Sequence, residues 1–381
     1  VVNPRKITVL GATSGDTGSA AMAAFKNSSY ADVFILFPEG RISEVQRRQM
    51  TTMDRSNIYP IAVAGDFDDC QALVKAMFND SQFKDKVNLT GVNSINWARV
   101  MCQITYFFYA ATALGAPKET VSFSVPTGNF GDIFAGYVAK RMGLPIDRLV
   151  IATNENDILN RALETGIYRK EHLMKTMSPS MDIQVASNFE RILFESLDRR
   201  GEKVNELFDK LNIDGGFVLD SETLKRLRVD FSSCSVSEER TAVTINSVLK
   251  SHGRLVCPHT AVGISAAQKF SRIGTKMITL ATAHPAKFPE AAKIASNIIP
   301  PLPKNYEDIY LKKETLIQST KNLADVKEII SENLTKNAET LGVYINKDND
   351  FKIETQKEIS LSKKLLEFPD VIEQISEELE P

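Results

Sequence analysis

The stretch ITVLGATSGDTGSAAMAAF, residues 7–25, contains the change of pattern that decides the fold. Its first residues, 7–10, are apolar and partly β-branched, which indicates a buried strand. Gly11, Gly15 and Gly18 then mark a turn, and residues 16–28 have the composition of a helix. A strand that passes through a glycine-rich turn into a helix is typical of α/β proteins, so we expect parallel sheets flanked by helices.

The rest of the chain repeats this alternation. We expect further strands at 32–37, 58–63, 120–125, 148–153, 254–256 and 277–281. We expect further helices at 44–52, 68–78, 96–113, 133–141, 157–165 and 260–272, and mostly amphipathic helix over 187–250. The predicted organisation is a smaller α/β domain at 1–113, a larger one at 114–300 with a helical insertion, a C-terminal helical segment at 301–337, and a helical tail at 338–381.

Composition excludes several classes of function. The 381 residues are 43% hydrophobic and 25% charged, with a net charge of −2, which is ordinary for a globular protein and gives no electrostatic case for nucleic-acid or membrane binding. No apolar run approaches the roughly 20 residues that span a bilayer. The four cysteines form no CxxC pair and the four histidines have no metal-ligand spacing. We therefore expect a cytoplasmic protein with reduced thiols and no metal site.

The turn at 11–18 is the first candidate binding element. A helix N-terminus presents free N–H groups to a phosphate or carboxylate. Ser14 and Thr17 supply hydroxyls, and Asp16 can cap the first helical turn. The turn has neither the lysine of a P-loop nor the GxGxxG spacing of a dinucleotide site. A tight turn that binds no ligand explains the pattern equally well.

The second candidate element is VPTGNFGD, residues 125–132, between a strand and a helix. Gly128 and Gly131 flank Asn129 and Phe130, and a loop of this kind wraps backbone N–H groups around one anion. Two such helix starts in one chain suggest two anionic groups in one site. The alternative is a structural turn around a buried Phe130.

A third segment, TAHPAKF at 282–288, follows a predicted strand. Thr282 would lie at the carboxyl edge of a sheet, where open α/β sheets bind ligands. His284 and Lys287 are either acid–base groups or a packed ring and a solvated charge. Arg41 and Arg99 are possible phosphate clamps, although Arg41 can equally be a surface charge and Trp97 a core residue.

The motifs together are more specific than any one of them. GATSGDTG, FPEGRIS, NSINWAR, VPTGNFGD, ATNENDIL, SNFER, PHTAVG and TAHPAKF follow one another in this order. This series, over about residues 1–330, resembles threonine synthase of the bacterial and fungal type. That family is dependent on pyridoxal phosphate (PLP) and has the tryptophan-synthase-β fold, PLP fold type II. The resemblance implies conversion of O-phosphohomoserine and water to threonine and phosphate, the last step of threonine biosynthesis.

The resemblance also implies roles for individual residues. Gly128, Asn129, Phe130, Gly131 and Asp132 resemble the cradle of the cofactor phosphate, and Thr282 resembles the hydroxyl that meets the pyridine nitrogen of PLP. Substrate-binding residues are implied at Ser14, Gly15, Asp16, Thr17, Asn96, Arg99 and Arg41.

The chain departs from the family pattern at the catalytic lysine. In the family, the lysine that forms the Schiff base lies in a segment similar to A-F-K-D, before the strand that leads into GATSGDTG. We find no AFKD-like motif anywhere in the chain, and Lys287 does not occupy that place. We therefore expect an N-terminally truncated threonine synthase that has no catalytic residue in the chain and turns over substrate poorly.

The tail has a different resemblance. NAETLGV at 337–343 and EISLSKKLLEFPDVIEQISEELEP at 358–381 resemble part of the helical anticodon-binding domain of arginyl-tRNA synthetase. The alternative is an ordinary pair of charged helices. The tail has no basic stripe, so we expect no tRNA binding.

Two other functions remain open. One is a non-catalytic protein that keeps a PLP or phosphate pocket, and the other is a related PLP-dependent dehydratase. The expected partner is the small-molecule substrate O-phosphohomoserine, with the chain acting as a monomer or weak homo-oligomer, and with no nucleic-acid or membrane partner.

Overall fold

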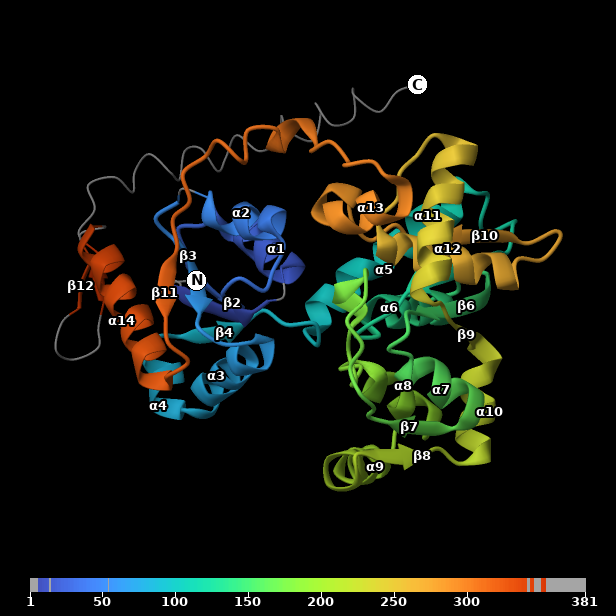
Figure 1. Ribbon diagram of the computed structural model, residues 1–381. Coiled ribbons are helices and arrows are strands. Elements are labelled where there is room, and N and C mark those ends of the chain that lie inside the picture. The colour runs from blue at the N-terminus through green and yellow to red at the C-terminus, as the bar shows by residue number, and fades with distance from the viewer. Residues whose placement is uncertain (1–5, 14, 54, 341–342, 346–350, 354–381) are drawn as a thin grey trace. The chain divides into compact units, whose positions relative to one another are not determined.

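A computed structural model describes residues 6–13, 15–53, 55–340, 343–345 and 351–353 (Figure 1). The chain divides into two compact units, residues 1–319 and residues 320–381. The first unit holds two parallel sheets, and each sheet has its own hydrophobic core. The fold is therefore α/β with parallel sheets flanked by helices, as the sequence predicts.

The first sheet has the strand order β11-β3-β2-β1-β4, and every pairing in it is parallel. Its strands are β1 (Ile7–Ala12), β2 (Ala31–Pro38), β3 (Ile58–Val63), β4 (Leu89–Gly91) and β11 (Ile317–Ser319). Its helices are α1 (Asp16–Phe25), α2 (Glu44–Thr51), α3 (Phe67–Asn79) and α4 (Ser81–Lys86). In Figure 1, α1 and α2 lie on one side of this sheet and α3 and α4 on the other.

The strand β2 lies at the centre of the first lobe, which is the first sheet together with its helices. All eight of its residues are buried, and the strand reads as an almost continuous apolar run. A strand that is covered by helices on both faces needs such a run. The core around it includes Val9, Met22, Val33 and Ile35.

The second sheet has the order β10-β5-β6-β9 and is also parallel throughout. Its strands are β5 (Val121–Pro126), β6 (Ile146–Thr153), β9 (Phe231–Ser235) and β10 (Lys276–Thr279). The helices of this lobe are α5 (Trp97–Ala113), α6 (Gly131–Arg141), α7 (Ile158–Thr165), α8 (Phe189–Ser196), α9 (Gly201–Asp214), α10 (Ser221–Asp230), α11 (Glu238–His252), α12 (Pro258–Phe270) and α13 (Pro289–Ser296). An antiparallel pair, β7 (Ile167–Arg169) and β8 (Gly216–Val218), lies outside the sheet, as do three short 3₁₀ turns, Pro179–Met181, Pro285–Lys287 and Lys304–Tyr306.

Helix α5 packs into the second lobe. Its buried residues Val100, Ile104 and Phe107 belong to the same core as Phe123 of β5 and Phe130. The sequence-based boundary at residue 113 assigned this helix to the first domain. The difference arises because the apolar face of α5 packs against α6 of the second lobe.

Three local expectations were wrong. Residues 254–256 form no strand. The region 187–250 contains the sheet strand β9, which the sequence analysis assigned to a helical region. Residues 301–316 contain no α-helix, although the sequence predicts a helical segment over 301–337. In each case the run is short, so pairing partners rather than local pattern decide its conformation.

The second unit contains the helix α14 (Leu323–Thr340) and the antiparallel strands β12 (Val343–Ile345) and β13 (Phe351–Ile353). The helical tail expected at 338–381, and its resemblance to a tRNA synthetase, lie mostly outside the described residues. Within the described part of the chain, no helix is long and apolar enough to cross a membrane.

Candidate active site

The turn after β1 is held by Thr13. The buried hydroxyl of Thr13 accepts hydrogen bonds from the main-chain N–H groups of Gly15 and Gly18, each at 2.9 Å. Gly15 has φ +136°, and a Cβ atom on it would lie 2.4 Å from the side chain of Gln46. Because Thr13 already satisfies two N–H groups, the polar groups that this turn offers to a ligand are chiefly its side chains.

Asp16, the first residue of α1, lies at the centre of a charged cluster. Its Oδ1 accepts hydrogen bonds from Lys287 Nζ at 2.7 Å and from Gln46 Nε2 at 3.2 Å. Its Oδ2 accepts one from Ser180 Oγ at 3.3 Å. Burial opposes the charge of Asp16, but Lys287 and Gln46 together hold the pKa of this carboxyl below its ordinary value. The turn at 11–18 is thus joined to the second lobe through the contacts of Asp16 with Lys287 and Ser180.

The turn after β5 lies at the carboxyl end of a central strand and begins α6. Phe130 has left-handed backbone, φ 64°, and its side chain is buried against Phe189 and Phe231. No side chain in the described part of the chain caps the N-terminus of α6. The structural interpretation of Phe130 is therefore confirmed, because the ring anchors the turn in the core. Among the described residues, the first N–H groups of the helix have no side-chain acceptor.

Asp132, in the first turn of α6, carries an unpaired oxygen. Its Oδ1 is buried and has no hydrogen-bond partner among the described residues. Burial raises the pKa of Asp132 to about 7. Near neutral pH this carboxyl therefore exists partly as a neutral acid, which can donate a hydrogen bond to an anion.

The sequence analysis missed Asn188, which holds the second turn in place. The carbonyl of Asn129 accepts hydrogen bonds from the N–H of Asn188 at 3.0 Å and from its Nδ2 at 3.1 Å. Asn188 Nδ2 also donates to the carbonyl of Ser94 at 2.9 Å, and Ser187 Oγ donates to Asn129 Oδ1 at 3.1 Å. The only signal was the quoted motif SNFER, to which no role was attached.

Thr282 follows β10 and is positioned by the start of α12. Its N–H donates to Thr260 Oγ1 at 3.2 Å, and its hydroxyl lies 3.6 Å from the buried thiol of Cys257. The side chain of Thr282 is exposed. Because β10 pairs with β5 in parallel, Thr282 and the turn at 128–132 lie at the same edge of the sheet.

His259 of α12 is a second residue to which sequence reasoning gave no role. Its ring is 3% exposed, packs against Phe288, and accepts the N–H of Ser180 on Nε2 at 3.1 Å. Burial lowers the pKa of His259 to about 4, so the ring is neutral at physiological pH. Its Nδ1 has no partner among the described residues.

The remaining candidates are distributed around these two turns. Ser14 lies outside the described residues, and Thr17 is half-buried in the first turn of α1. Asn96 uses its Oδ1 to cap α5, accepting the N–H of Ala98 at 2.9 Å. Arg99 Nη1 is buried without a partner in the described part of the chain, and burial lowers the pKa of this guanidinium. Arg41 is exposed, in the segment after β2.

Two other residues have structural roles. His284 accepts the N–H of Ala286 on Nδ1 at 3.2 Å and caps a 3₁₀ turn. The letters QFKD, residues 82–85, come nearest to the expected lysine motif, but Lys84 is exposed on α4.

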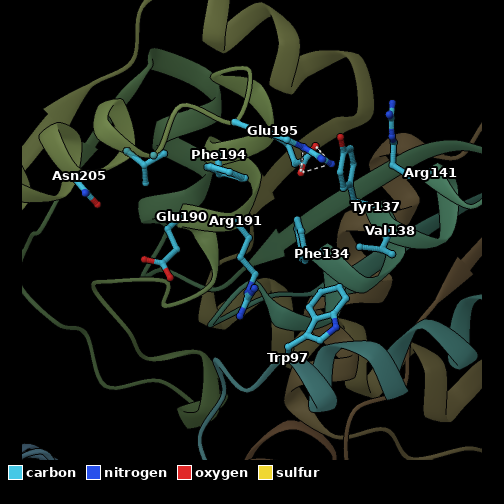
Figure 2. A pocket seen from close by; sticks show the side chains of 13 residues that line it. Trp97, Phe134, Tyr137, Val138, Arg141, Glu190, Arg191, Phe194, Glu195 and Asn205 are labelled. Atoms are coloured by element: carbon cyan, nitrogen blue, oxygen red, sulfur yellow. Dashed lines mark hydrogen bonds and ion pairs between the residues drawn. The ribbon is translucent and has the colours of Figure 1, made fainter.

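A groove of about 610 Å³ is lined by residues outside these turns (Figure 2). Trp97 lies on one wall, where the Arg191 guanidinium is 5.7 Å from its ring centroid, and Phe194 lies on another. Trp97 is 47% exposed and is not a core residue. None of the residues that line the groove belongs to the turn at 11–18 or the turn at 128–132.

The geometry fits two anionic groups. The turn at 128–132 offers one of them the uncapped start of a helix and the O–H of Asp132 in its protonated form. Lys287 offers an ammonium group beside the turn at 11–18 to another. Among the described residues, no group of three or more His, Cys, Asp or Glu side chains is placed to bind a metal ion.

Comparisons with known proteins agree with this geometry. Residues 3–210 match the family described as pyridoxal-phosphate dependent enzyme, and residues 260–330 match the family described as threonine synthase, C-terminal. The chain is 48% identical to threonine synthase from Pseudomonas aeruginosa over 329 residues, which covers 86% of this chain and 70% of that protein. It is 43% identical to the Saccharomyces cerevisiae threonine synthase, which covers 85% of this chain and 66% of that protein.

Solved structures give the same result. The chain superimposes on PLP-bound threonine synthase from Brucella melitensis with a TM-score of 0.84 and 51% identity, covering 86% of this chain and 71% of that one. A threonine deaminase from Solanum lycopersicum superimposes with a TM-score of 0.53 at 12% identity, covering 76% of this chain and 73% of that one, a likeness of fold alone.

Proposed function

Because the chain belongs to the threonine synthase family of PLP-dependent enzymes, we propose that it converts O-phosphohomoserine and water to threonine and phosphate with the two turns described above. The observation that carries the proposal is the meeting of both turns through Ser180. Its hydroxyl donates to Asp16 at 3.3 Å, and a Cβ atom on Gly128 would lie 3.0 Å from its carbonyl oxygen.

The second turn fits the phosphate of PLP. Gly128 approaches the Ser180 backbone more closely than a larger residue allows, and Gly131 lies beside Asn188. The uncapped N–H groups at the start of α6 donate to a phosphate, and Asp132 donates to it through the O–H of its protonated form. We assign Gly128, Asn129, Phe130, Gly131 and Asp132 to this role, and Thr282 to the ring nitrogen. When bound, PLP supplies the electron sink for carbanion chemistry.

The chain's own residues would bind and orient the substrate. Asp16 is a carboxylate beside the cofactor turn and can accept hydrogen bonds from an ammonium group. Arg99 has an unpaired guanidinium nitrogen that suits a phosphate or carboxylate oxygen. Ser14, Gly15, Thr17, Asn96 and Arg41 complete the proposed substrate side.

Lys287 is not the catalytic lysine in this proposal. Its Nζ is held by Asp16 Oδ1 at 2.7 Å, whereas a nucleophilic amine must be free to attack its substrate. We propose that the 381 residues bind PLP and substrate, and that turnover by these residues alone is slow.

Binding and turnover test the proposal separately. PLP is titrated into the chain by following its fluorescence, and O-phosphohomoserine, L-homoserine and threonine are then titrated into the loaded protein. We expect PLP to bind and O-phosphohomoserine to bind more tightly than the other two. Failure to bind PLP contradicts the proposal, and preference for free threonine favours the dehydratase alternative. Threonine formation at a normal enzymatic rate would contradict the expected slow turnover.

We further propose that the protein acts in the cytoplasm, as a monomer or weak homo-oligomer, without a nucleic-acid partner. The net charge of −2 supports the absence of a nucleic-acid partner. Sedimentation at several protein concentrations and a tRNA gel shift at physiological salt test these statements. Tight tRNA binding would contradict the last of them.

A further inference from the structure

The contact between Lys287 and Asp16 joins the two proposed halves of the site. Lys287 Nζ lies 2.7 Å from Asp16 Oδ1, and the two side chains are 23% and 33% exposed. The two residues are 271 positions apart in the chain. Among the described residues, the ammonium of Lys287 has no partner other than Asp16, so two of its three N–H donors remain available.

The Asp16 carboxylate has hydrogen-bond donors other than Lys287. Gln46 Nε2 and Ser180 Oγ also donate to its carboxylate, at 3.2 Å and 3.3 Å. Asp16 is the first residue of α1, where the helix dipole favours a negative charge. The carboxylate therefore keeps the hydrogen bonds from Gln46 and Ser180 and the favourable helix dipole when Lys287 turns to another anion.

Lys287 is also close to the cofactor turn. Ser180, which contacts Asp16, packs its carbonyl against Gly128. Thr282, the proposed partner of the PLP ring nitrogen, lies five residues before Lys287 on the segment that follows β10. An anion that displaces Asp16 from Lys287 would therefore lie beside a PLP molecule held by the turn at 128–132.

We propose that Lys287 binds the phosphate group of the substrate, and the phosphate product, by exchanging its Asp16 partner for this anion. The inference rests on the proposed function, and adds to it the residue that distinguishes O-phosphohomoserine from amino acids that have no phosphate. The substrate carboxylate could bind Lys287 in the same way, so the experiment also titrates L-homoserine, which has the carboxylate of the substrate but no phosphate.

The experiment measures phosphate affinity. Inorganic phosphate is titrated by calorimetry into the PLP-loaded chain, in which the cofactor turn is filled, and into the chain without PLP. Lys287→Gln and Asp16→Asn are compared with the matched pair Lys312→Gln and Asp308→Asn. Lys312 Nζ and Asp308 Oδ1 form an exposed ion pair of 2.9 Å outside the proposed site.

The two site variants have opposite expected effects. Lys287→Gln weakens phosphate binding roughly tenfold to a hundredfold, the range for loss of one charge-assisted hydrogen bond. Asp16→Asn leaves phosphate binding unchanged or tighter, because Lys287 is then free of its competitor. The control variants leave it unchanged. An ion pair with only a structural role would instead lower the thermal midpoint in both site variants and leave phosphate affinity unchanged.

Three results would overturn the inference. One is unchanged phosphate affinity in Lys287→Gln, and another is an equal loss of affinity in both site variants. The third is a loss of L-homoserine binding in Lys287→Gln without a loss of phosphate binding, which assigns the lysine to the carboxylate. Failure of PLP to bind the unaltered chain contradicts the proposed function instead, and the titration without PLP still tests Lys287.

Discussion

The carbonyl oxygen of Asn129 accepts two hydrogen bonds from Asn188, one from its main-chain N–H at 3.0 Å and one from its Nδ2 at 3.1 Å. Because the peptide bond is planar and trans, the N–H of Phe130 points away from Asn188. Asn188 is fully buried and also binds the carbonyl of Ser94, in the loop that leads into α5. One side chain therefore orients the proposed cofactor turn and the segment that carries Asn96 and Arg99.

We predict that Asn188→Asp weakens PLP binding about tenfold or more, since the variant replaces two donated hydrogen bonds with carboxylate oxygens that face carbonyl oxygens. PLP fluorescence titration measures the effect, and Asn205→Asp, at an exposed position, is the control for added charge. Unchanged PLP affinity in Asn188→Asp, with only a lowered unfolding midpoint, would assign Asn188 a purely structural role.

The raised pKa of Asp132 predicts how stability changes with pH. The folded chain holds this proton up to a pKa of about 7, whereas the ordinary value is 3.8. The free energy of unfolding therefore falls as pH rises from about 4 to about 7, by at most about 4 kcal/mol. Asp132→Asn removes this part of the dependence.

Urea unfolding of the unaltered chain and of Asp132→Asn at several pH values between 4 and 8 measures the difference. The same variant should make PLP affinity less sensitive to pH above 7, because no carboxylate then faces the phosphate. Parallel stability curves for the two proteins would show that Asp132 is ionised across the whole range.

Substitutions at Gly15 and Gly40 distinguish the cost of backbone strain from the cost of steric overlap. Gly15 (φ +136°) and Gly40 (φ +67°) both have positive φ, but only a Cβ on Gly15 meets other atoms, at 2.4 Å from Gln46. We predict that Gly40→Ala costs about 1 kcal/mol of unfolding free energy and that Gly15→Ala costs about 2–4 kcal/mol. Chemical denaturation measures both, and equal costs would show that Gln46 moves aside freely.

The neutral ring of His259 predicts a pH effect of the opposite sign. Its pKa is about 4 in the folded chain, against an ordinary 6.5, and the groups that affect it besides burial are Asp16 and Lys287. Its stabilising contribution is complete above pH 6.5 and is lost as pH falls towards 4, by at most about 3 kcal/mol.

His259→Gln removes this part of the acid sensitivity. At pH 7 it costs about 1–3 kcal/mol of unfolding free energy if the new side chain leaves the N–H of Ser180 without its acceptor. Unfolding free energies of the two proteins at pH 5 and pH 7 test both statements. A larger pH 5 to pH 7 difference in the variant than in the unaltered chain would be inconsistent with a neutral buried ring.

Much of the fold and the family was accessible from the sequence. The strand 58–63 and the helix that begins at Asp16 were predicted because long apolar runs and glycine punctuation are local signals. The ordered motifs identified the threonine synthase family, which the comparisons confirm. The assignments of single site residues, including Thr282 and Arg99, remain predictions.

Tertiary structure alone decided which polar groups meet. Nothing local in the sequence joins Asp16 to Lys287 or Asn188 to Asn129, because each contact arises only when segments that follow different strands come together at the carboxyl edges of the sheets. Likewise, β9 is a strand because it pairs with β6, and α5 belongs to the second lobe because its apolar face packs there. The sequence determined the elements through short-range pattern, and long-range packing and hydrogen bonding determined the site.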